Sequence, residues 1–297
     1  MVSAFKQPKH DKLARMRLKA DLTLLLAALV WGLGFIAQRN AALEVGALLF
    51  NAARWTLGGL VMLPFIRFNL HLDRKTLPWM AAGGFILFAA SGLQQTGLKF
   101  TTAGNAGFIT TLYVIMVPIF GLFWNHKTNL QTWIGALLAT IGLYFLSVSE
   151  KLNFSPGDGI VLISAVFFAF HVLIIGRLSP RTDPIKISII QFTVCAFLSF
   201  IFAFLTEEIT WHGIWGAAIP LLYGGVFSIG IAFTLQVIGQ RKAKPAHAAI
   251  ILSLESLFAA FGGWLLLSEG FTTRGLIGCG LMLAGIIISQ LNRNNHK

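Results

Sequence analysis

The sequence has few charged residues and almost no cysteine. Only 11% of its 297 residues are charged, against about 25% in an ordinary soluble domain. Its two cysteines, Cys195 and Cys279, lie in apolar stretches, so we expect buried thiols and no disulfide. It contains no zinc-ligand spacing, no phosphate-binding GxxxxGK[ST] loop and no Gly-x-Ser-x-Gly nucleophile motif. These absences argue against a soluble enzyme, a metal site, ATP hydrolysis by the chain itself and a bound cofactor.

What the chain has instead is apolar residues, at 56% of the sequence with a mean hydropathy of +0.75. A helix needs about 20 apolar residues to cross a bilayer. Charges, Pro and Asn/Asp/Gly clusters divide the chain into ten continuous runs of about that length, which predict an all-α integral membrane protein with ten transmembrane helices. The expected spans are 21–38, 47–66, 78–98, 103–124, 130–149, 157–178, 184–206, 213–239, 245–267 and 274–292.

The formal net charge of +12 is spread over small clusters between the apolar runs, and this distribution argues against nucleic-acid binding. Most of the 23 lysines and arginines fall inside the cell when the N-terminus is placed there. The exceptions are Arg39, Lys99, Lys151 and Arg274 outside and Arg54 within a span. We therefore expect cytoplasmic N- and C-termini, a basic N-terminal tail over 1–20 followed by an uncleaved first span, and a C-terminal tail over 293–297.

The two halves of the chain share landmarks when one is shifted by roughly 137–143 residues. Each half has five expected spans, an odd number, so the second half must cross the bilayer in the opposite sense. We expect two inverted five-helix repeats, 21–149 and 157–292, around a substrate site near the midplane. The matching positions are Asp21 with Asp158, Arg54-Trp55 with Gln191-Phe192, Gly83-Gly84 with Gly224-Gly225, Gln95 with Gln236, and Gly135 and Gly142 with Gly278 and Gly285.

Nearly the whole chain after Ala20 resembles the EamA-type carriers of the drug/metabolite transporter superfamily. In the second half the resemblance is carried by Ile250-Ile251-Leu252-Ser253-Leu254-Glu255-Ser256-Leu257-Phe258, Leu266-Leu267-Ser268-Glu269-Gly270, Gly275-Leu276-Ile277-Gly278 and Ala284-Gly285. In the first half it is carried by Trp31-Gly32, Arg54, Thr101-Thr102-Ala103 and Pro118. The resemblance implies ten helices in two repeats and, usually, export of amino acids or other small metabolites. The chain departs from the family at Ser256, where a Pro is common.

Ionisable side chains within spans are costly, so each is a candidate for substrate binding or ion coupling. Glu255 is the deepest acid, and burial would favour its protonated form, so it could couple protons or bind a substrate amine. Arg54 could bind a substrate carboxylate, or it could be a structural partner of Glu44 or a loop carbonyl. His171 could relay protons or simply form a hydrogen bond within the bundle.

Uncharged polar and aromatic side chains within spans complete the set of candidates. Gln94, Gln95, Gln191 and Gln236 could line a polar path or join helices, and the repeat pairing favours Gln95, Gln191 and Gln236 for the path. Trp31 and Tyr113 fall near mid-span, where they could form a cavity wall. Pro118 and Pro220 are expected to interrupt their helices.

The sequence therefore predicts a secondary carrier, an exporter of amino acids or similar metabolites that works by alternating access and is coupled to protons. We place it in a bacterial inner membrane, as a monomer or homodimer that needs no ATPase subunit. A carrier of drugs or nucleotide sugars is the nearest alternative. A membrane-embedded lipid-modifying enzyme is the alternative of another class, and it would require catalytic groups clustered at one face of the membrane.

Overall fold

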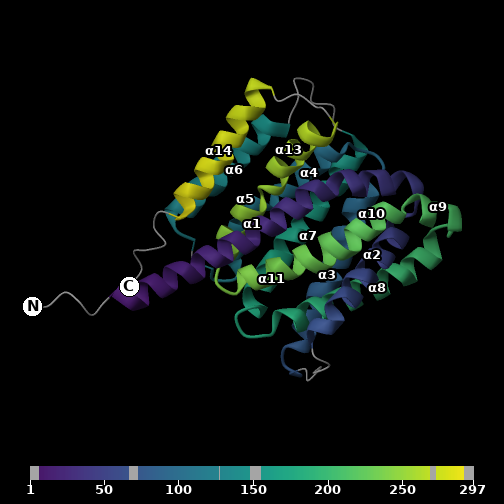
Figure 1. Ribbon diagram of the computed structural model, residues 1–297, viewed down its shortest axis with the longest axis horizontal. Coiled ribbons are helices and arrows are strands. Elements are labelled where there is room, and N and C mark those ends of the chain that lie inside the picture. Colours follow the sequence, from purple (N-terminus) through teal and green to yellow (C-terminus); the bar gives the residue numbers. More distant parts are fainter. Residues whose placement is uncertain (1–6, 67–72, 127, 148–154, 268–271, 291–297) are drawn as a thin grey trace, which may run out of the picture.

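The computed structural model describes residues 7–66, 73–126, 128–147, 155–267 and 272–290, and within them all regular structure is helical (Figure 1). The elements are α1 (Gln7–Glu44), α2 (Ala47–Met62), the 3-10 turn η1 (Leu63–Ile66), α3 (Leu77–Gly97), α4 (Ala103–Thr111), α5 (Tyr113–Phe123), α6 (Leu130–Ser147), α7 (Pro156–Leu178), α8 (Pro184–Thr206), α9 (Trp211–Gly216), α10 (Ala218–Leu222), the π-helix η2 (Tyr223–Phe233), α11 (Thr234–Gln240), α12 (Pro245–Leu252), α13 (Glu255–Leu267) and α14 (Thr273–Gln290).

The described residues form nine apolar helical segments long enough to cross a membrane, and α6 supplies a shorter apolar one over Leu130–Leu146. Many large apolar side chains on the outside of the bundle are exposed, as expected for a surface that faces lipid. Trp211 and Trp215 are 79% and 75% exposed in the short helix α9, and tryptophans commonly anchor a helix at the membrane interface. The predicted all-α, multi-pass membrane fold is confirmed.

The first helix is longer than the sequence analysis expected. The N-terminal tail was placed at 1–20, but α1 is continuous from Gln7 to Glu44. The segment 9–31 contains neither Pro nor Gly and is rich in Ala, Leu, Lys and Arg, so nothing stops the helix at the membrane surface. Residues 1–6, the segment 268–270 of the family-like motif and the C-terminal tail 293–297 lie outside the described residues.

The fourth and ninth spans, expected as single helices, are each broken in two. The fourth changes from α4 to α5 at Leu112, and the ninth changes from α12 to α13 at Ser253-Leu254. The expected interruption at Pro118 is wrong, because Pro118 lies inside α5 and the break comes earlier. The two halves of the fourth span contact those of the ninth, α4 against α13 and α5 against α12. Both breaks therefore lie deep in the bundle, beside each other.

The eighth span is also irregular. Pro220 lies within the short α10, and the next eleven residues, Tyr223–Phe233, form the π-helix η2 before α11 continues to Gln240. Glycines in η2 let α2 approach closely, since a Cβ on Gly225 would lie 2.6–2.8 Å from three atoms of the Leu57 side chain. π-Helical segments are rare and often occur at functional sites.

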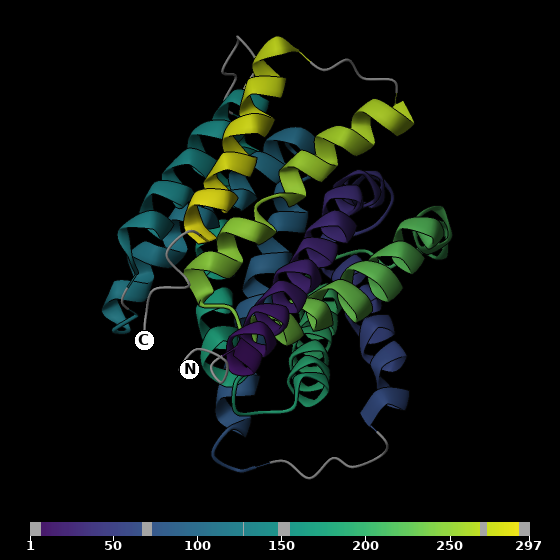
Figure 2. The same ribbon diagram turned by 60° about the vertical axis from the view of Figure 1, so that its left-hand side comes forward.

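The helices α6 and α14 cross on one flank of the bundle, where their backbones touch (Figures 1 and 2). A Cβ on Gly135 would lie 2.6 Å from the carbonyl oxygen of Gly285, and a Cβ on Gly142 would lie 2.6 Å from that of Gly278. The clashes are reciprocal, because a Cβ on Gly285 would meet the Gly135 carbonyl and one on Gly278 the Gly142 carbonyl. Only glycine fits at these four positions.

Candidate functional site

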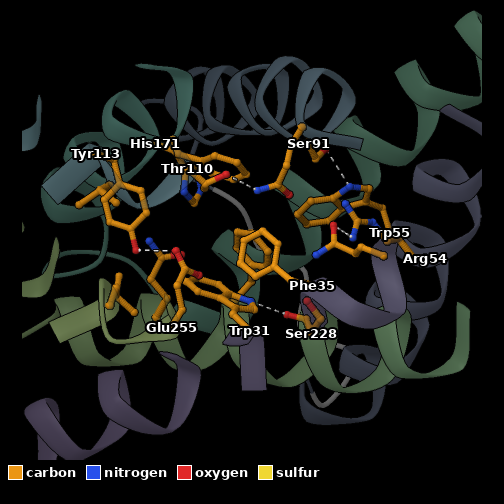
Figure 3. Close-up of a pocket in the computed structure, with 17 residues that line it drawn as sticks. Trp31, Phe35, Arg54, Trp55, Ser91, Thr110, Tyr113, His171, Ser228 and Glu255 are labelled. Carbon is orange, nitrogen blue, oxygen red and sulfur yellow. Dashed lines mark hydrogen bonds between the residues drawn. The ribbon is translucent and has the colours of Figure 1, made fainter. Parts of the chain in front are cut away.

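A central cavity of about 50 Å³ lies among the deep segments of the bundle, including both broken spans and the π-helix (Figure 3). It has room for one or two water molecules, so it is too small for a metabolite in this conformation. The lining combines aromatic rings with polar side chains, and it includes one arginine and one glutamate. It consists of Trp31, Phe35, Gln38, Arg54, Trp55, Ser91, Gln94, Thr110, Tyr113, Phe168, His171, Val172, Ser228, Phe233, Gln236, Leu252 and Glu255.

Arg54 is positioned at one end of the cavity by α2 and is only 3% exposed. Its Nε donates to Asn51 Oδ1 at 2.8 Å and its Nη1 to Gln38 Oε1 at 2.7 Å, while the guanidinium lies 5.0 Å from the centre of the Phe50 ring. The missing side chain of Gly224 leaves room for it, because a Cβ there would lie 3.4 Å from Arg54 Cδ. No acidic side chain of the described residues forms a salt bridge with Arg54.

Glu255 lies at the opposite end of the cavity in Figure 3, at the start of α13. It is 4% exposed, and its Oε1 accepts hydrogen bonds from Tyr113 Oη at 3.2 Å and Thr111 Oγ1 at 3.3 Å. Thr111 is also 2.7 Å from Ser256 Oγ. These bonds join the break in the fourth span to the break in the ninth. Within the described part of the chain, Glu255 has only neutral hydrogen-bond partners and no salt bridge.

The aromatic residues form the wall between these two ends. Trp31 donates its Nε1 proton to the Ser228 carbonyl at 3.0 Å and packs against Phe233 with ring centres 4.6 Å apart. Trp55 also packs against Phe233, with ring centres 5.0 Å apart, and donates to Ser91 Oγ at 3.2 Å. Because their indole N–H groups are already bonded to Ser228 and Ser91, these rings offer the cavity a mainly apolar surface suited to aliphatic or aromatic parts of a solute.

The structure brings six of the eight candidate residues to the cavity: Trp31, Arg54, Tyr113, His171, Gln236 and Glu255. The other two lie directly behind it. Gln191 Oε1 is 3.1 Å from His171 Nε2, and Gln95 Nε2 donates at 2.9 Å to the backbone oxygen of Gln38, a residue that holds Arg54. The expected alternative of a bond between Arg54 and Glu44 is not seen, since Arg54 bonds to Asn51 and Gln38.

The repeat pairing favours Gln95 over Gln94 for the polar path, but it is Gln94 that lines the cavity, where it donates to Thr110 Oγ1 at 3.0 Å. One position along a helix turns a side chain by about 100°, so a repeat alignment that is correct to one residue cannot choose between the two. Gln38, Ser91 and Ser228 gave no signal, because a single small or amide side chain in a span is common.

Each end of the bundle has a polar contact between a first helix of one half and the segment that begins the fourth span of the other. At one end, the Nε2 atom of His247 lies 3.1 Å from Asp21 Oδ1, and its Nδ1 lies 3.2 Å from Ser289 Oγ. At the other end, Thr101 Oγ1 donates to the buried carboxylate of Asp158. We refer to these as the Asp21 clamp and the Asp158 clamp. No group of three His, Cys, Asp or Glu side chains that could bind a metal occurs in the described ranges.

The EamA-like transporter family matches this chain twice, over residues 18–148 and again over 155–291. The chain belongs to this family. Together the two matches cover almost all of the membrane-spanning region, so the resemblance to EamA-type carriers is confirmed.

Relatives of this EamA-like chain are named as transporters. An uncharacterized transporter of Archaeoglobus fulgidus is 34% identical, with 93% of this chain and 87% of that protein aligned. The uncharacterized transporter YoaV of Bacillus subtilis is 23% identical over 94% of this chain and 99% of its own. A WAT1-related chloroplast protein of Arabidopsis thaliana is 22% identical, with 89% and 68% aligned. The family and these names identify this chain as a membrane transporter.

A solved structure shares the fold with a TM-score of 0.78 at 19% identity, and the alignment covers 93% of this chain and 99% of that one. The likeness extends over nearly the whole helical bundle, so the helices around the central cavity are arranged as in a known fold.

Proposed function

We propose that this transporter is a proton-coupled exporter of amino acids or similar small metabolites, acting in the bacterial inner membrane. The observation that carries the proposal is the pair of buried ionisable side chains, Arg54 and Glu255, at opposite ends of one cavity. In the described residues each is bonded to neutral groups alone. Ionisable groups are expensive at this depth, and a role in binding and coupling accounts for their presence.

Arg54 is the proposed binding group for the substrate carboxylate. Its two hydrogen bonds use fewer N–H donors than a guanidinium has, so donors remain for a planar anion. The aromatic wall beside it would contact the apolar part of an amino acid, and the Gln38 amide and the Ser228 hydroxyl add neutral polar groups near by. A bound substrate carboxylate would form an ion pair with the Arg54 guanidinium, which has no acidic partner among the described residues.

Glu255 is the proposed coupling group. It is separated from Arg54 by the aromatic wall, so it can bind a proton while the substrate occupies the other end. Its partners, Thr111 and Tyr113, come from the break in the fourth span. Discontinuous helices of this kind form the substrate and ion sites of many secondary transporters. A change of protonation at Glu255 would therefore act on both broken helices together.

Alternating access between two inverted repeats is the proposed mechanism. The double family match and the breaks in the fourth and ninth spans support the repeat. The glycine crossing supports a two-fold axis. In the repeat, Gly135 corresponds to Gly278 and Gly142 to Gly285. This correspondence turns the contact of Gly135 with Gly285 into the contact of Gly278 with Gly142, as a two-fold axis requires. With the N-terminus in the cytoplasm, the Asp21 clamp closes the inner end and the Asp158 clamp the outer end.

The test begins with metabolite profiles of cells with and without the protein, and then measures uptake of the accumulated solutes into inverted membrane vesicles. Glu255→Gln keeps the shape of the side chain and fixes it as neutral. We expect it to abolish accumulation driven by a pH gradient and to leave substrate exchange without a gradient near the wild-type rate.

Glu207→Gln is the matched control, because Glu207 accepts from the backbone N–H groups of Leu48 and Leu49 outside the cavity. It should leave gradient-driven accumulation intact. A Glu255→Gln protein that still concentrates substrate would rule out this coupling site. Failure of that variant to accumulate in the membrane would assign Glu255 to folding instead.

A further inference from the structure

A second cavity, of about 440 Å³, lies at the end of the bundle that holds the Asp21 clamp. It is formed between α5, α6, α7, α12 and α14, with Arg17 of α1 at its edge. A cavity of this size can hold a small metabolite, unlike the much smaller central cavity. We call it the basic cavity, after the ionisable side chains that line it: Arg17, His126, Lys242, Lys244 and His247.

The charge of this lining has one sign. None of the described residues that line it is acidic, and Asp21, whose Oδ1 lies 3.1 Å from His247 Nε2, is a carboxylate in contact with this lining. Burial and the nearby Arg177 lower the pKa of His126, so it is neutral at neutral pH and offers hydrogen bonding. The positive potential therefore comes from Arg17, Lys242 and Lys244, while neutral amide and hydroxyl groups such as Asn129 complete the wall.

One layer of apolar side chains separates the basic cavity from the central cavity. Val172 lines the central cavity and the adjacent Leu173 lines the basic one, and both belong to the same buried cluster. On the facing helices, Tyr113 and Leu252 belong to the central cavity, whereas Val117 and Ala246 border the basic one. The two cavities therefore lie in series, and movement of this single layer would connect them.

We propose that the basic cavity is the inner mouth of the transport pathway, where the anionic group of a substrate, a carboxylate or a phosphate, first binds. This inference depends on the proposed function and adds an entry site to it. Lysine and arginine charges in a recess attract anions from solution and raise their local concentration. An acid collected here has one apolar layer to pass before it enters the central cavity near Tyr113, and Arg54 lies at the far end of that cavity. Selection for a negative group would then occur twice along the path.

The test uses the purified full-length chain in nanodiscs of phosphatidylcholine, with inorganic phosphate as the probe and chloride to match ionic strength. Phosphate should raise the melting temperature. Lys242→Gln combined with Lys244→Gln should weaken the apparent phosphate affinity about tenfold, because two charge-assisted contacts, partly screened by water, are removed. Arg181→Gln combined with Arg241→Gln is the matched control, since both arginines are exposed and neither lines the cavity.

Equal protection of the lysine variant and the wild type by phosphate would overturn the proposal. A second arm uses nanodiscs that contain phosphatidylglycerol. If that lipid, and not phosphate, protects the wild type and fails to protect the lysine variant, the cavity holds a lipid headgroup and is not an entry site.

A transport assay separates this inference from the proposed function. The lysine variant should raise the KM for an acidic substrate about tenfold with kcat near wild type. If the KM of the lysine variant is unchanged and its proton-coupled transport is normal, the basic cavity is not the entry site, and the proposed function is unaffected. If the protein binds phosphate but transports no amino acid or related acid, the proposed function is refuted, and the entry role is refuted with it.

Discussion

Arg54→Lys tests whether the arginine of the central cavity binds a substrate carboxylate. The substitution keeps the positive charge and removes the planar fork. In the structure Nε and Nη1 hold Asn51 and Gln38, so the remaining donors at the tip can face a carboxylate in the bidentate manner. A lysine that keeps those two neutral partners has a single donor left for the substrate.

The expected magnitude follows from the loss of one hydrogen bond to a charged group. Such a bond contributes about 1.5–3 kcal/mol, so kcat/KM for an amino acid should fall roughly 10- to 150-fold. The corresponding amino-acid amide, which has no carboxylate, cannot form the bidentate pair, and its slower transport should change little. The variant should therefore reduce the difference in kcat/KM between the amino acid and its amide.

The assay is uptake of a matched acid and amide into inverted vesicles that contain equal amounts of wild-type or variant protein. Arg39→Lys is the control, because Arg39 also donates to neutral acceptors, the carbonyls of Leu98 and Lys99, but does not line the cavity. It should leave the ratio of acid to amide transport unchanged. An equal loss for acid and amide in Arg54→Lys would refute carboxylate binding and leave Arg54 with a structural role.

Two further predictions concern the helices around the site. Gly142→Ala should lower the free energy of unfolding by at least about 2 kcal/mol, since the new Cβ would lie 2.6–2.8 Å from backbone atoms of α14; Gly280→Ala, whose Cβ would meet nothing within 4 Å, should cause no loss, and equal midpoints of thermal unfolding would contradict the close crossing. Asp21→Ala should open the inner end, so that a cysteine placed at Ser228 reacts about tenfold faster with a membrane-impermeant thiol reagent from the cytoplasmic side. Asp158→Ala should raise labelling from the outer side instead, and identical labelling in both variants would show that neither contact controls access.

The membrane fold could be predicted because the apolar runs are long and the charges fall between them. The two helix breaks could not, because the spans that contain them have mean hydropathies of 2.0 and 1.4, within the range of the unbroken spans. What distinguishes these segments is a contact over 145 positions, Thr111 with Ser256, and hydroxyl groups that bond locally compete with the regular helix ladder. A short stretch of sequence around either break gives no indication of this contact.

The candidate site was predicted in kind but not in detail. Arg54 and Glu255 were found because an ionisable residue within a span is rare. Asp21 was recognised only as a repeat landmark, since its partner His247 is 226 positions away. Gln94 was passed over for its neighbour because the choice depends on the rotation of α3, which hydropathy does not record.

The uninterrupted length of α1 has a mechanical consequence. Between Asp21 in the Asp21 clamp and Arg39, which donates to the Leu98 carbonyl near the opposite end of the bundle, it rises about 27 Å, close to the thickness of the hydrocarbon layer. Near its middle, Gly32 rests on the backbone of Glu255 and Trp31 is tied to Ser228. Because α1 is one continuous helix, it can act as a rigid element that pivots where it contacts Glu255, the proposed coupling residue. A tilt of α1 that opens one end of the bundle would close the other end. The two entrances could then never be open together, and one rigid helix would be enough to couple them.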